Sequence, residues 1–251
     1  MESEYSFQEV WDQIKILQRA GVGIVPVVGY RNPRWPERHG PNWLQKYTQS
    51  EFEQRVLDWV ERCVREFQSV SNIIAWQVEN EPFDNHWGEA GFDVRPVYSR
   101  AIDTIRSMDP RPCLVSYGFQ PWKNNFGDKD LPEDIVGLDV YTKIGQKILG
   151  VPMYPDNFLV PFADQRLEHA VARLKRVEKE VWITELQAEP WDCVDGALSD
   201  RKLWERTIHP KRFARNIQHA SRPGVSAICI WGVEWWYTLD TATRQAFLAQ
   251  L

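Results

Sequence analysis

Short apolar runs alternate with amphipathic stretches along the chain, and no other feature of the sequence restricts the fold as much. The apolar runs predict strands at residues 23–30, 72–82, 112–119, 134–142, 181–190 and 227–237. Apolar residues recur at helical spacing at residues 6–21, 50–67, 97–109, 164–179, 209–221 and 240–250. Strands that are apolar along nearly their whole length are typical of a parallel sheet covered by helices. The sequence therefore predicts an α/β fold.

The composition is that of an ordinary globular protein, with 43% hydrophobic and 26% charged residues. A chain of 251 residues is long enough for one large domain, and we expect a single domain spanning residues 1–251. The net charge of −5 and the absence of a basic block argue against a nucleic-acid partner. No apolar run reaches about 18 residues, so we expect no membrane-spanning segment.

The N-terminal residues MESEYSFQEVWDQ are acidic and amphipathic and do not resemble a signal peptide. If this N-terminus is genuine, it favours a cytoplasmic protein; the localisation is otherwise left open. The four cysteines are far apart and contain no CxxC pair, which favours free thiols over a disulfide framework or a zinc site. Because the chain also lacks HxH and HExxH spacings, we expect no metal.

Polar and aromatic residues gather after the predicted strands, at the ends where a (β/α)8 barrel builds its active site. No glycine-rich phosphate-binding motif follows a strand, so a nucleotide-binding sheet lacks its main support. Only six strands are visible, however, and a closed barrel of this type has eight. We therefore predict a (β/α)8-type fold with six strands in this chain.

Thirteen tryptophans are more than a core of this size requires, and many lie in or just after the predicted strands. Packing in the core is one interpretation. The other is that they form flat surfaces on which the C–H face of a sugar ring stacks while its hydroxyls bond elsewhere. The tryptophans at these positions are Trp35, Trp43, Trp87, Trp122, Trp191, Trp231, Trp235 and Trp236.

Two glutamates end predicted strands: Glu81 in WQVENEP and Glu185 in VWITELQAEP. By the two-residue period of a strand, Val181, Ile183 and Glu185 share one face. Two carboxylates at one end of a barrel can flank a glycosidic bond, and their mutual repulsion leaves one as an acid and the other as a base. The alternatives are a carboxylate that caps the next helix for Glu81 and a buried salt bridge to an arginine for Glu185.

The motifs RNPRWPE, WQVENEP, ITELQAEPW and WGVEWWY together resemble the clan of retaining β-glycoside hydrolases built on (β/α)8 barrels, which includes cellulase-like and β-galactosidase-like families. The Asn-Glu-Pro sequence after a strand is moderately specific alone. With a strand-end glutamate 104 residues later and a tryptophan-rich last strand, it becomes a strong signature. The resemblance covers nearly the whole chain.

The resemblance implies a role for each of several residues. Glu81 is expected to be the acid/base and Glu185 the nucleophile, with their carboxyl carbons about 5 to 5.5 Å apart for a retaining enzyme. Asn80 is expected to bind the sugar 2-hydroxyl, which requires the strand to end or bulge so that adjacent residues can both serve. Tyr141 corresponds to the tyrosine that bonds the nucleophile, and Trp231 or Trp235 to the tryptophan beneath the sugar. The alternatives are packing at the barrel rim for Tyr141 and filling of the core for Trp231. These substrate-binding assignments are Asn80, Tyr141, Trp231 and Trp235.

Three other glutamates compete for these roles. Glu79 shares strand parity with Glu81 and is an alternative acid, although a supporting role is favoured. Glu189 and Glu234 are weaker candidates, expected to pair with arginines or to lie near a sugar subsite.

Compared with the family pattern, the six strands correspond to the third to the eighth of the barrel. Truncation, closure into a smaller barrel and pairing with a second copy through open edges are the competing explanations. The predicted function is a glycoside hydrolase of weak activity that needs no cofactor and acts on a carbohydrate. The alternative is a carbohydrate-binding barrel with little or no turnover.

Overall fold

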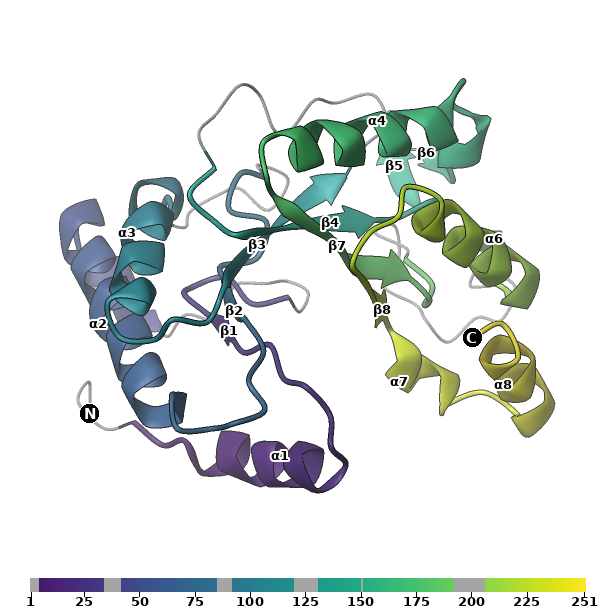
Figure 1. Ribbon diagram of the computed structural model, residues 1–251. Coiled ribbons are helices and arrows are strands. Elements are labelled where there is room, and N and C mark those ends of the chain that lie inside the picture. Colours follow the sequence, from purple (N-terminus) through teal and green to yellow (C-terminus); the bar gives the residue numbers. More distant parts are fainter. Residues whose placement is uncertain (1–4, 34–41, 85–91, 120–130, 150, 192–205) are drawn as a thin grey trace. The chain divides into compact units, whose positions relative to one another are not determined.

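The computed structural model describes residues 5–33, 42–84, 92–119, 131–149, 151–191 and 206–251 (Figure 1). The contacts within the chain divide it into two compact units. The first unit consists of Met1–Ser116 and Asp130–Asp134, and the second of Tyr117–Lys129 and Ile135–Leu251. Their boundary falls between Ser116 and Tyr117, inside one strand.

The first unit contains the strands β1 (Val27–Val28), β2 (Trp76–Val78) and the first half of β3 (Cys113–Phe119). β2 pairs in parallel with both β1 and β3. The helices are α1 (Gln8–Arg19), η1 (Asn42–Lys46), α2 (Gln49–Phe67) and α3 (Arg95–Arg106). Helices α2 and α3 lie side by side, and they pack on β1 and β2 (Figure 1). The apolar face of α2, which includes Phe52, Val60 and Val64, is fully buried there.

A capping box starts helix α2. The sequence S-E-F-E at residues 50–53 is compatible with a box that begins at Ser50, but the structure places the N-cap at Thr48. The Thr48 side chain accepts a hydrogen bond from the Glu51 N–H, and the Glu51 carboxylate accepts one from the Thr48 N–H. The helix therefore begins two residues earlier than this motif suggests.

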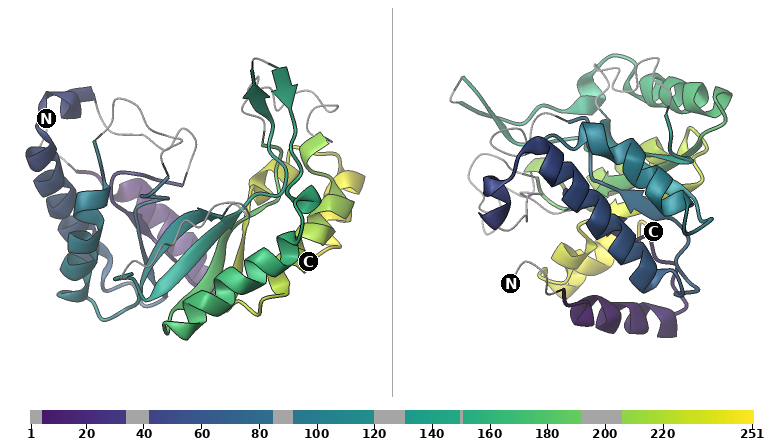
Figure 2. Two further views of the ribbon diagram at one scale, coloured as in Figure 1. Left: turned by 90° about the horizontal axis from the view of Figure 1, so that it is seen from above. Right: turned by 90° about the vertical axis from the view of Figure 1, so that its left-hand side faces the viewer.

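The second unit contains β4 (Ile135–Val140), β7 (Glu180–Gln187) and β8 (Ala227–Trp231), which pair in parallel. Helices α4 (Ala163–Arg176) and α6 (Pro210–Ser221) pack on β7, and α8 (Thr241–Leu248) packs on α6. An antiparallel hairpin of β5 (Gln146–Ile148) and β6 (Val151–Met153), together with η2 (Asn157–Leu159), lies between β4 and α4 in the chain. The sequence analysis predicted no such hairpin, which extends away from the strands of this unit (Figure 2).

In the described part of the chain, the six strands of the main sheet follow the order β1-β2-β3-β4-β7-β8. This is their order along the chain, with helices in the connections, so the predicted α/β class and the six strands are confirmed. Pro26 precedes the two-residue strand β1 at the start of this order, where a residue without a backbone N–H is tolerated.

One predicted strand is wrong in its second half. Residues 227–237 were expected to be a strand throughout, but β8 ends at Trp231 and α7 (Val233–Trp236) follows it. Gly232 separates the two with a φ of +93°, which a residue with a side chain rarely adopts. Trp235 and Trp236 consequently belong to a helix, in which their own side chains are buried.

Strand β7 is irregular directly before Glu185. Leu138 of β4 is aligned with Ile183, but the next residue, Asp139, is aligned with Glu185, so Thr184 is an additional residue in β7. The alternation of faces is interrupted there, and the prediction that Ile183 and Glu185 share one face is wrong. The bulge instead places Glu185 in register with Asp139, on the side of β4 that Tyr141 continues.

Gly137 provides the space for this bulge. A Cβ atom on Gly137 would lie 2.5 Å from the Thr184 Oγ1. We expect Gly137→Ala to lower the free energy of unfolding by about 1–3 kcal/mol, as overpacking does. Denaturant unfolding checks this, and in a Thr184→Ala background the same change should cost clearly less. Equal costs in the two backgrounds would contradict this explanation.

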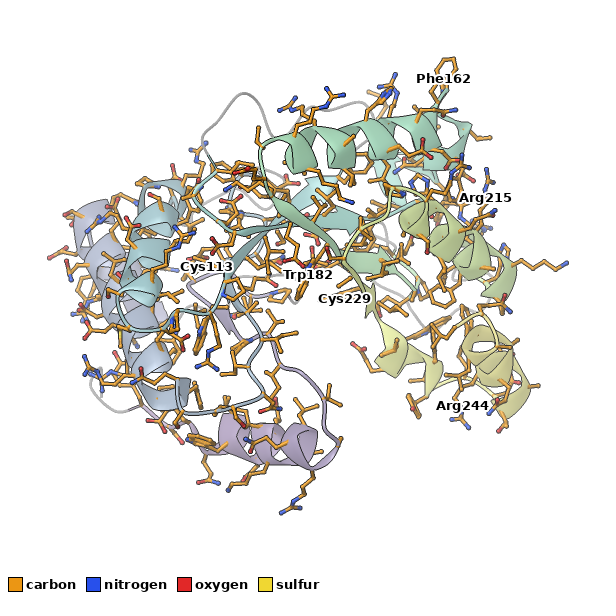
Figure 3. All side chains as sticks on the ribbon, in the orientation of Figure 1. Cys113, Phe162, Trp182, Arg215, Cys229 and Arg244 are labelled. Atoms are coloured by element: carbon orange, nitrogen blue, oxygen red, sulfur yellow. The ribbon has the colours of Figure 1, made fainter. Side chains whose placement is uncertain are left out.

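Three of the cysteines are described, and all three are free thiols, as predicted. Cys63 and Cys113 are buried, whereas Cys229 on β8 is exposed; Figure 3 labels Cys113 and Cys229 on their strands. Cys193 lies outside the described residues. Among the described helices, none combines the length and the apolar character needed to cross a lipid bilayer.

Candidate active site

The segment after β2 leaves the regular strand before it reaches the candidate acid. β2 ends at Val78, and the next residues include two with positive φ: Glu79 at +58° and Glu81 at +43°. Left-handed backbone at residues other than glycine costs free energy, and such positions are concentrated at functional sites. Because the strand has ended, the adjacent residues Asn80 and Glu81 are not restricted to opposite faces of the sheet. The condition that the sequence analysis set for Asn80 is thereby met.

Asn80 is almost fully buried, and its amide is held in one orientation. The Oδ1 atom accepts hydrogen bonds from the Gln77 Nε2 at 3.1 Å and from the Ser116 Oγ at 3.0 Å. The Nδ2 atom has no hydrogen-bond partner among the described residues. A buried donor without an acceptor is unfavourable, so this amide is suited to a ligand oxygen.

The backbone of Glu81 is held from both sides. Its N–H donates to the Ser116 Oγ at 3.1 Å, and its carbonyl accepts from the Arg31 Nη1 at 2.7 Å. Glu81 is only 8% exposed. The side chain thus begins from a fixed position in a largely buried setting.

Glu79 is fully buried, and each of its carboxylate oxygens accepts a backbone N–H, from Tyr30 at 2.9 Å and from Arg31 at 2.7 Å. Burial raises the pKa of Glu79 to about 7, and the hydrogen bonds from the Arg31 and Tyr30 amides and the charge of Arg31 act in the opposite direction. This carboxylate faces the protein interior rather than a ligand.

Glu185 lies in the second unit and is hydrogen-bonded as predicted. The Tyr141 hydroxyl donates to the Glu185 Oε2 at 2.7 Å, and Glu185 is 8% exposed. Tyr141 is itself positioned, because its carbonyl accepts from the Asn157 Nδ2 at 2.6 Å and its ring lies 5.5 Å from that of Trp191. The predicted pairing of Tyr141 with Glu185 is therefore present in the structure.

A buried polar network supports the ends of β4 and β7. The Gln187 Oε1 accepts from the N–H groups of Thr142 and Lys143 at 3.0 and 3.1 Å. From α6, the Asn216 Nδ2 donates to the Gln187 carbonyl at 2.9 Å, and Arg212 donates to the Thr142 carbonyl at 3.0 Å. The residue next to Tyr141 and the strand that carries Glu185 are thus anchored to one helix.

Trp231 and Trp235 occupy different surroundings. The Trp231 Nε1 donates to the Glu189 Oε1 at 2.9 Å, and Trp231 is half-buried. Burial raises the pKa of Glu189, the hydrogen bond from Trp231 lowers it, and nearby Glu234 raises it. Trp235 is 7% exposed and packs with Phe213, Trp236 and Phe247 in a hydrophobic core cluster. Of the two tryptophans, Trp231 is the one with a ring still partly open to a ligand.

The structure brings Asn80 and Glu81 together in the first unit and Tyr141 and Glu185 together in the second. Arg31 and Ser116 are partners of the first pair that the sequence pattern did not predict. Glu189 was expected to pair with an arginine or to lie near a sugar subsite, and it accepts a hydrogen bond from the Trp231 Nε1. Among the described residues, no three His, Cys, Asp or Glu side chains form a group that could hold a metal ion.

A protein-family model described as Cellulase (glycosyl hydrolase family 5) matches residues 6–188. This segment is well over half of the chain and includes Glu81 and Glu185. No curated protein matches the sequence.

Several solved structures resemble the chain. A family 10 endo-β-1,4-xylanase from Gloeophyllum trabeum has a TM-score of 0.59 and 16% identity, covering 92% of this chain and 70% of that one. An endo-1,4-β-xylanase from Caldicellulosiruptor owensensis has a TM-score of 0.58 and 14% identity, covering 93% of this chain and 73% of that one. A family 113 β-1,4-mannanase has a TM-score of 0.59 and 11% identity, covering 98% of this chain and 79% of that one.

At these identities the likeness concerns the fold, and it confirms the predicted (β/α)8 type with six of its strands in the described residues. The chain spans only 29% of a larger β-galacturonidase from Eisenbergiella tayi, with 20% identity over 72% of this chain and a TM-score of 0.47.

Proposed function

Because the chain belongs to the cellulase family, glycosyl hydrolase family 5, we propose that it cleaves a β-linked sugar by double displacement with Glu81 and Glu185. Membership of this family supports glycoside hydrolase activity and a carbohydrate substrate. The observation that carries the finer proposal is the hydrogen bond from the Tyr141 hydroxyl to the buried Glu185 carboxylate.

Glu185 is suited to the role of nucleophile because its side chain is oriented. The Tyr141 hydroxyl holds one carboxylate oxygen, Oε2, at 2.7 Å and stabilises negative charge on it. The other oxygen is the one assigned to attack. Tyr141 is anchored by Asn157 and by the network at Thr142, so the pair is held by the scaffold rather than by the ligand.

Glu81 is assigned as the acid/base, and Asn80 as the residue that bonds the sugar 2-hydroxyl. The donor required for that bond is the buried Nδ2 of Asn80, which has no partner among the described residues. Since Gln77 and Ser116 occupy its Oδ1, the amide presents N–H rather than oxygen. Hydrogen bonds at the 2-hydroxyl strengthen in the transition state and so accelerate the reaction.

In the first step, a Glu185 carboxylate oxygen attacks the anomeric carbon and forms an ester bond while the bond to the leaving oxygen breaks. Glu81 donates its proton to that oxygen, and the alcohol departs. In the second step, Glu81 takes a proton from water, the water oxygen attacks the anomeric carbon, and the ester bond breaks. One water is consumed, and both carboxyl groups return to their starting states.

The substrate is proposed to be a β-linked saccharide, with Trp231 as the surface beneath its ring. The half-buried indole is fixed by its hydrogen bond to Glu189, which leaves its face for C–H stacking. The xylanases and mannanases that share the fold are named for β-1,4 linkages, which supports a β-configured substrate.

A panel of aryl β-glycosides tests this proposal. We expect release of the aryl alcohol from at least one of the β-glucoside, mannoside, galactoside and xyloside, with the β-anomer of the sugar as the first product in a ¹H NMR time course. Retention follows from two inversions at the anomeric carbon. An α-anomer formed first would contradict double displacement. Sugar binding in calorimetry without any turnover would favour the binding-only alternative.

A further inference from the structure

Glu79 is a buried carboxylate that the proposed chemistry does not use. Its two oxygens accept the N–H groups of consecutive residues, Tyr30 at 2.9 Å and Arg31 at 2.7 Å. These residues follow β1, whereas Glu79 follows β2. One side chain therefore fixes the backbone of a segment that lies about 50 residues earlier in the chain.

The Arg31 side chain, in turn, binds the backbone of the segment that follows Glu79. Its Nη1 donates to the Glu81 carbonyl at 2.7 Å and to the Asp84 carbonyl at 3.1 Å. The turn after β1 is held by Glu79, and the same turn holds the segment 81–84 through Arg31. We call this pair of reciprocal contacts the Glu79–Arg31 clamp. The clamp thus ends at the backbone carbonyl of Glu81, the residue proposed as the acid/base.

The clamp requires an unusual backbone conformation and a close approach between its two segments. Glu79 and Glu81 both have positive φ, so the segment is held away from relaxed backbone geometry. Gly29 has a φ of +128°, and a Cβ atom there would lie 2.4 Å from the Glu79 Oε1. Only glycine allows the turn to approach the carboxylate this closely. A carboxylate that merely filled space would not require such an approach.

We propose that Glu79 is a positioning residue whose ionised carboxylate holds the turn at Tyr30 and Arg31, and through Arg31 holds Glu81 in place for catalysis. This inference rests on the proposed function of Glu81. Each N–H is bonded to its own carboxylate oxygen, and protonation turns one of these oxygens into an O–H donor that is a weaker acceptor. Protonation therefore weakens one of the two N–H bonds, and the clamp loosens.

The charges around Glu79 are few among the described residues. In the turn after β1, the charge of Arg31 lowers the pKa of Glu79. On the segment that carries Glu79, the charged residues are Glu81, two residues further along, and Asp84, whose carbonyl accepts a hydrogen bond from Arg31. The side chains that β3 and α2 contribute nearby are Ser116, which bonds Asn80, and Phe52, which packs on Tyr30; both are uncharged. Because burial raises the pKa of Glu79 to about 7, the clamp changes state near neutral pH.

The pH profile of Glu79→Gln tests the inference. In wild type, we expect kcat/KM for an aryl β-glycoside to rise with pH along an acid limb centred near pH 7. In Glu79→Gln this limb should disappear, and the plateau should fall by roughly tenfold to a hundredfold, as misplaced catalytic groups cause. The thermal unfolding midpoint of wild type should fall over the same pH interval, because ionising a buried carboxylate is unfavourable. A purely structural role would make activity follow stability, whereas the clamp makes the two move in opposite directions.

Asp109→Asn is the matched control. Asp109 is also a buried carboxylate of the first unit and accepts hydrogen bonds from Arg111. It lies before the N-terminal end of β3, however, whereas Glu79 follows the C-terminal end of β2. Its substitution should lower stability and leave the acid limb in place. If Asp109→Asn moves the limb as Glu79→Gln does, the positioning role of Glu79 is overturned.

A second measurement separates this inference from the proposed function. In ¹⁵N-labelled protein, the Tyr30 and Arg31 amide signals should titrate near pH 7 in wild type and not in Glu79→Gln. If these amides titrate but no glycoside is cleaved, the clamp stands and the proposed function fails. If cleavage occurs with the same acid limb in both proteins, the proposed function stands and the inference is overturned.

Discussion

Replacing Glu185 with glutamine should lower kcat for an aryl β-glycoside by about 10⁴- to 10⁶-fold, the range over which enzymes lose kcat when one of their catalytic residues is removed. Glutamine has nearly the same shape and can still accept the Tyr141 hydroxyl bond, so the site should keep its structure. What it lacks is the charged oxygen that forms the ester bond. Steady-state kinetics measure the effect, and circular dichroism checks that the variant is folded. A loss of less than about tenfold in kcat would contradict the assignment of Glu185 as the nucleophile.

Two comparisons make this result specific. Glu180→Gln is the same substitution on the same strand, at an exposed position where the side chain bonds the Trp182 Nε1, and it should leave kcat unchanged. Glu81→Gln should be slow on a phenyl glycoside, which needs a proton donor, and much less impaired in forming the ester from a dinitrophenyl glycoside. Glu185→Gln should be slow on both, because a better leaving group does not replace a nucleophile.

Raising the pH from 4.5 to above 7 should lower the free energy of unfolding by about 3 kcal/mol through Glu79 alone. Burial raises the pKa of Glu79 from 4.5 to about 7 in the folded state. The folded state therefore binds this proton more tightly than the unfolded state does. The resulting stabilisation is fully present below pH 4.5 and is lost as the pH rises through 7. Urea unfolding at intervals of half a pH unit measures this dependence.

Other groups titrate in the same interval, so the informative quantity is the difference between wild type and Glu79→Gln. Burial lowers the pKa of His219, which makes stability rise with pH in part of this range, and burial raises the pKa of Glu189, which acts in the same direction as Glu79. Both remain in the variant and cancel in the difference. Parallel stability curves for the two proteins would show that Glu79 is not the group responsible.

The helices and the order of the strands could be predicted from the sequence because both depend on periodicity. The helix predicted at 50–67 has six buried apolar positions at regular spacing. It starts at Gln49 rather than at Ser50, because its N-cap is Thr48, two residues before the N-cap that the motif at Ser50 suggests. The run after Trp231 was assigned incorrectly because a short apolar segment fits a strand and a buried helix equally well. The β5–β6 hairpin was missed because its segment has no clear alternation of apolar and polar residues.

Some residues of the candidate site could likewise be predicted from local sequence patterns, and others could not. Asn80 and Glu81 are recognisable because the residues are adjacent in a strand-end motif, and Tyr141 and Glu185 each end an apolar run. Arg31 and Ser116 lie 50 and 35 residues from Glu81, and no local pattern links them to it. The bulge at Thr184 was equally hidden, because an additional residue in a strand depends on its pairing with the neighbouring strand.

The role proposed for the buried Asn80 Nδ2, donation to the sugar 2-hydroxyl, has a consequence for which sugars the site would accept. A 2-deoxy sugar would bring no oxygen to accept from this amide. Sites that leave a buried donor empty reject such analogues far more strongly than sites that merely fit them poorly, by about 10⁴-fold where it has been studied. Selectivity of this kind comes from the hydrogen bond that the wrong molecule fails to make.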